Sequence, residues 1–347
     1  MSKTDSVSVY RIIFITVVLL FARRGDLVAQ DDFMRISQTT ADPMLDPRKT
    51  VGFQTCLKCH AAEAAVWSTT WHQTSINTMH RSTASKQIAS KLGLQSIKYS
   101  DRCIQCHYTP TMNGGEKVIA AAVSCECCHG AGSDWVQTHF PPKANIGKET
   151  AEQKATRVAR NLKNGMRNRH NTFTMARICM RCHNVADEEL VNVGGHSIGN
   201  AGFEMVSYSQ GLMRHRFVSG GGKSNAPNSP ERLNMIYVSG MIADLEFSLR
   251  ATANATSSKS FGKQVATRAA KAAQRLKSVN QKVPLPILKQ ILGEYAAVQL
   301  KANNASALNA AAEKIRELGV RFGAKHDGSE LAAIQQFVPR PGQWMFE

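Results

Sequence analysis

The sequence predicts a mainly α-helical protein with two unlike parts, and three observations support this prediction. All nine cysteines lie between residues 56 and 182. A Gly-, Ser- and Asn-rich stretch, residues 219–229, then interrupts the chain. Beyond it, an Ala-rich segment carries apolar residues at helical spacing. We therefore expect a loop-rich N-terminal part followed by a C-terminal helical bundle.

The N-terminus is typical of an export signal. Lys3 and Arg11 precede an apolar run, residues 12–22, which is too short to span a bilayer and has the length of a secretory h-region. Residues 1–29 are therefore predicted to be a signal peptide that is cleaved before Gln30, and the protein to be periplasmic or otherwise exported. Because Arg23 and Arg24 are unusual before a cleavage site, an uncleaved N-terminus associated with the membrane stays an alternative. Residues 30–50 are expected to be irregular.

Eight of the nine cysteines form four repeats of the pattern CxxCH. The repeats are Cys56-x-x-Cys59-His60, Cys103-x-x-Cys106-His107, Cys125-x-x-Cys128-His129 and Cys179-x-x-Cys182-His183. Two cysteines at this spacing can add across the two vinyl groups of one porphyrin, and the adjacent histidine then reaches the iron. The sequence therefore predicts four covalently attached haem c groups, each with a proximal histidine.

Two other uses of these cysteines are disfavoured by the pattern. Disulfides suit an exported protein, but they do not require a histidine directly after every second cysteine. A structural zinc site uses Cys and His ligands, yet a histidine adjacent to the second cysteine is poorly placed to share one tetrahedral metal with both thiolates. Cys127 is the ninth cysteine, and we expect it to be a free, buried thiol.

The sixth coordination position of each haem iron needs a second ligand or stays open. Seven histidines lie outside the motifs, and a second histidine gives the low potentials usual for chains of haems. His72 and His139 are the favoured candidates, because His72 follows two tryptophans on a helix expected from Ala61 to about His80, and His139 comes ten residues after the third motif. One of His196 and His215 is expected to be a further ligand. The weaker candidates are His80, His170 and His326.

The chain is strongly basic, with a formal net charge of +17. Part of the Lys and Arg excess is expected to neutralise the anionic haem propionates. The remaining positive charge can steer an acidic redox partner toward the protein. Nucleic acid is not an expected partner. A capping-box sequence, Thr150 to Gln153, opens a predicted helix that runs to about Asn164 and carries much of this charge. That helix is expected to face solvent or propionates, with docking of an acidic partner as the alternative.

The motif order resembles that of the cytochrome c five-five-four family of tetrahaem electron carriers. The resemblance covers roughly residues 50–220, and its most specific part is the third motif, which extends as Cys-Glu-x-Cys-His-Gly-x-Gly and is followed by a histidine. The type member of that family accepts electrons from hydroxylamine oxidoreductase. By this resemblance, three haems have two histidine ligands each, and the haem of Cys103, Cys106 and His107 is five-coordinate. Cys127 and the long extension after residue 220 depart from the type member.

The positions of the cysteines, the Gly-rich stretch and the Ala-rich segment divide the chain into three parts. These are a tetrahaem domain over 51–218, a linker over 219–229 and a helical domain over 230–347. Asn113-Gly114-Gly115 predicts a tight turn. Helices are expected near 231–252, 260–278, 286–301, 305–322 and 329–337, with Gly323 ending the fourth.

The function expected from these patterns is electron transfer between redox partner proteins. The alternative is a multihaem oxidoreductase that acts on a small nitrogen compound, such as nitric oxide, nitrite or hydroxylamine, at an open iron. Whether the protein is an enzyme depends on whether one haem iron has an open coordination position.

Overall fold

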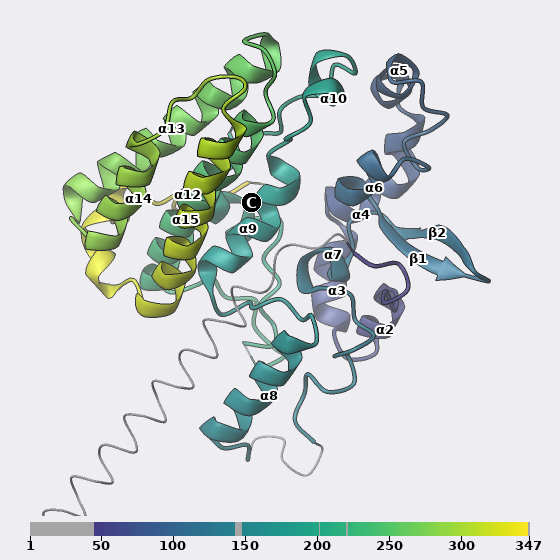
Figure 1. Cartoon of the computed structure of the whole chain (residues 1–347). Helices are drawn as coiled ribbons and strands as arrows, with labels where there is room; N and C mark the ends of the chain where they lie inside the picture. Colours follow the sequence, from purple (N-terminus) through teal and green to yellow (C-terminus); the bar gives the residue numbers. More distant parts are fainter. Residues whose placement is uncertain (1–44, 143–147, 201, 220, 346–347) are drawn as a thin grey trace, which may run out of the picture.

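The computed structural model describes residues 45–142, 148–200, 202–219 and 221–345 (Figure 1). The predicted signal peptide and most of the expected irregular segment lie outside the described residues. Helices dominate what is described, and the only sheet there is a two-stranded hairpin, so the predicted mainly α fold is confirmed.

Short helices form the N-terminal part. They are α2 (Phe53–Leu57), α3 (Ala61–Ser68), α4 (Trp71–Thr78), a 3₁₀ turn (Met79–Arg81), α5 (Thr83–Lys91), α6 (Asp101–His107), α7 (Cys125–His129), α8 (Ala151–Lys163), α9 (Thr172–His183), α10 (Glu188–Asn192) and α11 (Met205–Gln210). Strands β1 (Thr109–Asn113) and β2 (Glu116–Ala121) pair antiparallel between α6 and α7. Gly114 and Gly115 have positive φ angles of 57° and 88°, so the predicted turn is confirmed and joins these strands.

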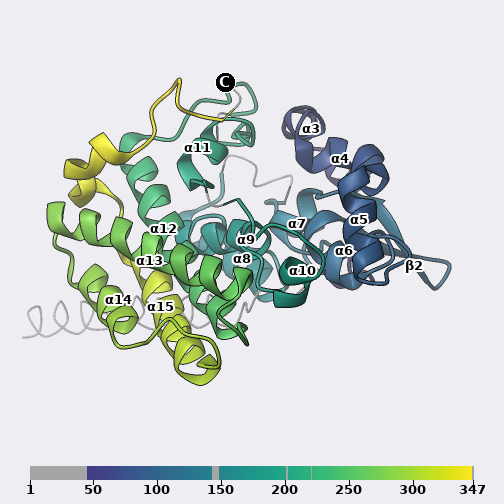
Figure 2. The ribbon, with the colours of Figure 1, turned by 90° about the horizontal axis from the view of Figure 1, so that it is seen from above.

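The C-terminal part is a helical bundle around α12 (Pro230–Ala253). Helices α13 (Ser260–Lys282), α14 (Pro286–Ala296) and α15 (Ala305–Lys325) follow, and a 3₁₀ helix (Ser329–Phe337) comes last. Helix α12 packs against α9, α13 and α15, and it buries residues on every face because it lies at the centre. Both views place α9 between the bundle and the small helices (Figures 1 and 2).

Helix α9 belongs to the core of the bundle although it precedes the predicted linker. Phe173, Ala176 and Met180 join the same buried cluster as Leu245 and Ile315. Two glycines of α15 allow the close approach: a Cβ on Gly319 would lie 2.4 Å from the Phe173 ring, and one on Gly323 would lie 2.3 Å from Asn171 Oδ1. The hydrophobic core therefore extends across the predicted boundary at 219–229.

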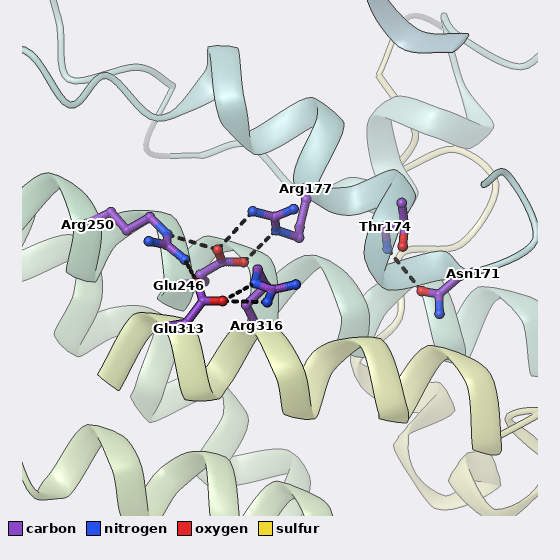
Figure 3. Close-up of polar contacts among 7 residues, drawn as sticks. All are labelled: Asn171, Thr174, Arg177, Glu246, Arg250, Glu313 and Arg316. Atoms are coloured by element: carbon purple, nitrogen blue, oxygen red, sulfur yellow. Dashed lines mark hydrogen bonds and ion pairs between the residues drawn. The ribbon is translucent and has the colours of Figure 1, made fainter. Parts of the chain in front are cut away.

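A cluster of ion pairs, buried at Glu246 and partly exposed at Glu313, spans this junction (Figure 3). The guanidinium of Arg177 on α9 donates two hydrogen bonds of 2.8 and 3.1 Å to the fully buried carboxylate of Glu246 on α12. Arg250 links Glu246 to Glu313 on α15, at 3.0 and 2.8 Å respectively. Arg316 completes the cluster with a 2.8 Å bond to Glu313. The cluster therefore joins three helices, and α9 is the one that carries the fourth motif.

Several expected helix boundaries differ from the structure. The helix expected from Ala61 to about His80 is broken into α3 and α4, because Thr70 adopts an extended backbone and begins a new helix. Gly323 does not end the fourth bundle helix, which continues to Lys325, since that glycine serves helix packing instead. The helix expected over 286–301 ends at Ala296. The capping box predicted for α8 is confirmed, with both reciprocal bonds between Thr150 and Gln153 present.

Within the described ranges, none of the helices combines the length and the apolar character needed to cross a lipid bilayer.

Candidate haem-binding sites

Each CxxCH motif lies at a helix end. In α6, α7 and α9 the motif histidine is the last helical residue, and His60 caps the N-terminus of α3 after the first motif in α2. Because a short helix holds the two cysteines one turn apart, both thiols lie on one side and the histidine follows them. The second, third and fourth motifs therefore share one local geometry, whereas in the first motif α2 ends at Leu57 and the N–H of His60 closes a turn on the carbonyl oxygen of Cys56 at 2.9 Å.

Every motif histidine faces one histidine from elsewhere in the chain. The distances between ring centroids are 6.0 Å for His60 and His139, 6.2 Å for His72 and His183, 6.1 Å for His107 and His196, and 6.2 Å for His129 and His215. We call these the four histidine pairs. His72, His139, His196 and His215 are the four distal candidates that the sequence indicated, and the structure brings each of them to a motif.

The spacing of the pairs fits one metal ion between two imidazoles. A metal–imidazole bond is about 2 Å long, and the ring centroid lies roughly 1 Å beyond the bonded nitrogen, so two trans imidazoles have centroids roughly 6 Å apart. Within the described residues, no three His, Cys, Asp or Glu side chains gather as a metal site. Two protein ligands per centre suit a porphyrin, which supplies the four equatorial nitrogens itself, and they do not suit the zinc alternative.

Three of the distal histidines are oriented by backbone carbonyl groups. Nδ1 of His139 lies 2.7 Å from the carbonyl oxygen of Val136, and Nδ1 of His196 lies 2.7 Å from that of Ser197. Nδ1 of His215 lies 2.6 Å from the carbonyl oxygen of Met213. Since a carbonyl only accepts, each Nδ1 carries the proton and donates it, which leaves Nε2 unprotonated and available to a metal.

Burial favours the neutral form of five of the paired imidazoles, and the neutral form is the one that ligates iron. Burial, assisted by nearby imidazoles, lowers the pKa of His107 to about 4 and that of His183 to about 4. The same causes lower the pKa of His129 to about 3. Burial also lowers the pKa of His72 and of His139.

The motifs meet in pairs through their thiols. Cys56 of the first motif and Cys125 of the third share a hydrogen bond, which lowers the pKa of Cys56 and raises that of Cys125. Cys106 of the second motif and Cys182 of the fourth do the same, with the pKa of Cys182 lowered. None of the nine cysteines forms a disulfide. The first motif therefore lies against the third, and the second against the fourth.

Cys127 is buried, as predicted, and its thiol lies 3.2 Å from the hydroxyl oxygen of Thr109. Burial raises the pKa of this thiol. A raised pKa makes the thiol a poor nucleophile, and the buried Cys127 side chain packs inside the third motif, between Cys125 and Cys128.

Sequence reasoning missed a buried carboxylate that connects two motifs. Glu126 stands between the cysteines of the third motif and is 1% exposed. Its oxygens accept hydrogen bonds from the backbone N–H groups of Val51 at 3.0 Å, Gly52 at 2.9 Å and Gly132 at 2.8 Å. Glu126 thereby holds the chain that enters the first motif against the third. The Glu inside the Cys-Glu-x-Cys sequence was the available signal.

Two arginines fix the ends of motif helices. Arg268 of α13 donates to the carbonyl oxygen of His183 at 2.9 Å and pairs with Asp244 at 2.6 Å. Arg102, directly before Cys103, pairs with Asp187 at 2.8 Å and with Glu189 at 2.6 Å.

The weaker distal candidates His80, His170 and His326 take no part in the four histidine pairs.

Each site has two cysteines at the spacing that forms thioethers, an adjacent histidine and a second imidazole across from it. This arrangement is that of a c-type cytochrome, a protein that binds haem covalently and transfers electrons. Residues 55–130 match the model of the family described as cytochrome c554 and c-prime. The matched segment contains the first three motifs and supports membership of a multihaem c-type cytochrome family. No match to a curated protein or to a solved structure was found.

Proposed function

We propose that the protein is an exported tetrahaem c-type cytochrome that passes electrons between redox partners. The observation that carries the proposal is that each of four CxxCH motifs presents its histidine to a second histidine, with ring centroids 6.0 to 6.2 Å apart. Haem iron supplies the one-electron chemistry. Export rests on the N-terminal sequence alone, which lies outside the described residues.

The residues of each site have separate roles in this proposal. The two cysteines anchor the group covalently, the motif histidine is the proximal ligand, and its partner is the distal ligand. His139 serves the first motif, His215 the third and His72 the fourth. Carbonyl hydrogen bonds orient His139 and His215, and burial favours the neutral form of His72 and His139, so that little reorganisation accompanies a change in iron charge.

The contacts between motifs support an order for electron movement. The thiol contacts join the first motif to the third and the second to the fourth. Helix α7 with the third motif contacts α9 with the fourth. The motifs therefore follow the order first, third, fourth, second, and we expect electrons to enter and leave at the first and second haems.

An acidic protein is the partner that the surface charge favours. Lys154, Arg160 and Lys163 are exposed on α8. The same helix contacts the distal residue of the first haem, because Arg157 donates to the carbonyl oxygen of His139 at 2.6 Å. A partner that docks on α8 is thus placed near one end of the chain of haems, where electrostatic attraction speeds association.

Mass spectrometry of protein produced in a cell that attaches haem tests the proposal. The chain should gain the mass of about four porphyrins. Replacing Cys125 and Cys128 together by Ser should lower the gain by one, whereas Cys127→Ser, a change at the cysteine between them, should keep all four. A product at the bare polypeptide mass, or equal loss in both variants, would refute the assignment.

A further inference from the structure

The second motif is the one whose haem the family resemblance leaves five-coordinate, yet its histidine has a partner. His107 ends α6, and the His196 ring lies across from it at a centroid distance of 6.1 Å. This spacing falls within the range of the other three histidine pairs. The Nδ1 of His196 donates to a carbonyl oxygen in the same way as those of His139 and His215. This pair therefore resembles the other three in the distance between its rings, and it resembles those of His139 and His215 in the hydrogen bond of the distal imidazole.

The backbone before His196 is a closed turn at the end of α10. The N–H of His196 donates to the carbonyl oxygen of Leu190 at 3.1 Å, and that of Gly194 donates to Glu189 at 3.1 Å. A Cβ on Gly194 would lie 2.5 Å from the Leu190 carbonyl oxygen, so the turn closes only around a glycine at that position. The position of His196 is therefore fixed by α10.

Arg102 fastens α10 to the helix of the second motif. It directly precedes Cys103, and its guanidinium bridges Asp187 and Glu189, at the start of α10, at 2.8 and 2.6 Å. The side chain of Arg102 is about one third exposed, with 31% of its surface accessible, so part of this bridge is shielded from water. The distal and proximal histidines of this pair thus sit on elements that are tied to each other.

The C-terminal bundle holds the other side of α10. The carboxylate of Glu188 accepts hydrogen bonds from Thr256 N–H at 2.7 Å and from the Ser257 hydroxyl at 3.1 Å. Asn192 accepts a bond from the N–H of Phe261 at 3.0 Å. Phe261 is also buried in an apolar cluster with Val191. Both views place α10 between α13 and α6 (Figures 1 and 2).

We infer that His196 is the sixth ligand of the haem on the second motif, held there by the C-terminal bundle through α10, so that all four haems have two histidine ligands. The inference rests on the proposed function, because it requires haem at this motif. It removes the vacant iron position that a reaction with nitric oxide, nitrite or hydroxylamine needs at that haem. It also gives the extension after residue 220 a structural role, which is to hold His196 at this coordination site.

Electron paramagnetic resonance of the oxidised holoprotein tests the inference. The wild-type protein should show low-spin signals alone and should not bind cyanide. His196→Ala should give one high-spin haem per chain that binds cyanide, and added imidazole should restore the low-spin state. The control His326→Ala, at a histidine outside the four histidine pairs, should match the wild type. One high-spin haem in the wild-type protein, or no spectral change in His196→Ala, would overturn the ligand assignment.

The part played by the bundle has its own test. Glu188→Ala removes the bonds to Thr256 and Ser257, and we expect cyanide to bind the second haem faster than in the wild type. The control Glu231→Ala changes an exposed acid at the start of α12 and should leave cyanide binding unchanged. If Glu188→Ala binds cyanide like the wild type while His196→Ala gains a high-spin haem, the role of the bundle is overturned and the ligand assignment stands. The wild type and every variant should each carry four haems. If they do, any of these outcomes bears on the ligand or on the bundle and not on the proposed function.

Discussion

Arg177 and Glu246 form a buried, two-pronged ion pair between the helix that carries the fourth CxxCH motif and the central helix of the C-terminal bundle. Their positions differ by 69 residues, and the predicted linker lies between them. Removing one partner leaves an uncompensated charge in a buried place. We therefore expect Glu246→Ala to destabilise the folded holoprotein by about 3–5 kcal/mol.

The matched comparison is the double variant Arg177→Met with Glu246→Leu. It replaces the pair with apolar side chains of similar size, and we expect much of the lost stability to return. Chemical denaturation followed by circular dichroism measures both variants. Equal losses in the single and double variants would show that the helix contact depends on the charges themselves.

Replacing His139 by Ala should convert one of the four proposed haems from low spin to high spin. The reason is that the His139 ring lies 6.0 Å from that of His60 and its Nδ1 donates to the Val136 carbonyl oxygen, so its other nitrogen would be available to ligate the iron. Electron paramagnetic resonance measures the change. His170→Ala alters a histidine outside the four histidine pairs and should leave the spectrum as it is. An unaltered spectrum in His139→Ala would exclude it as a ligand.

Charge reversal on α8 should slow electron exchange with an acidic partner at low ionic strength. The double variant Lys154→Glu with Lys163→Glu reverses exposed positive charge on the helix that contacts His139, near the proposed site of the first haem. Stopped-flow rates should fall several-fold, and the difference should shrink as salt is added. The double variant Lys271→Glu with Lys277→Glu makes the same change in charge on the exposed side of α13. If both variants slow the reaction equally, the effect comes from net charge and not from docking on α8.

Acid should weaken the ion-pair cluster through Glu313. Hydrogen bonds and charge from Arg316, and then from Arg250, lower the pKa of Glu313 to about 2 from a model-compound value of 4.5. A carboxyl with a lowered pKa stabilises the fold above its unfolded pKa, and this contribution disappears as the pH falls toward the folded pKa. Glu313→Gln should therefore cost most stability near pH 6, progressively less as the pH falls below 4.5, and almost none once the pH is below 2. A cost that does not vary with pH would assign the effect to packing.

The local features of this chain could be predicted from its sequence, because each depends on residues that are close together. The CxxCH spacing, the turn at Gly114 and Gly115, and the cap of α8 by Thr150 all fall in this class. The partners of the distal histidines could not be assigned. His72 follows the first motif by 12 residues, yet it faces His183 of the fourth. Such pairings depend on the path of the whole chain and leave no periodic signal.

The same reasoning explains where expectation and structure differ. The sequence named His196 and His215 as candidates and favoured one of them as a ligand, and the structure places both rings opposite motif histidines. Gly323 has the usual character of a helix stop, but tertiary contact with Asn171 requires a small residue inside the helix. Arg102 and Glu126 were not recognised, since an Arg or Glu beside a cysteine looks like ordinary surface charge until its partners are known.

Because α9 is packed into the bundle, the Gly-rich stretch at 219–229 is a poor place to divide the protein. A fragment that ends at residue 218 retains every cysteine but exposes Phe173, Ala176 and Met180, which are buried against later helices in the full chain. Expression of such a fragment should yield aggregation or a loosened fourth site rather than a compact carrier. Any useful minimal form of this cytochrome therefore has to keep its C-terminal helices.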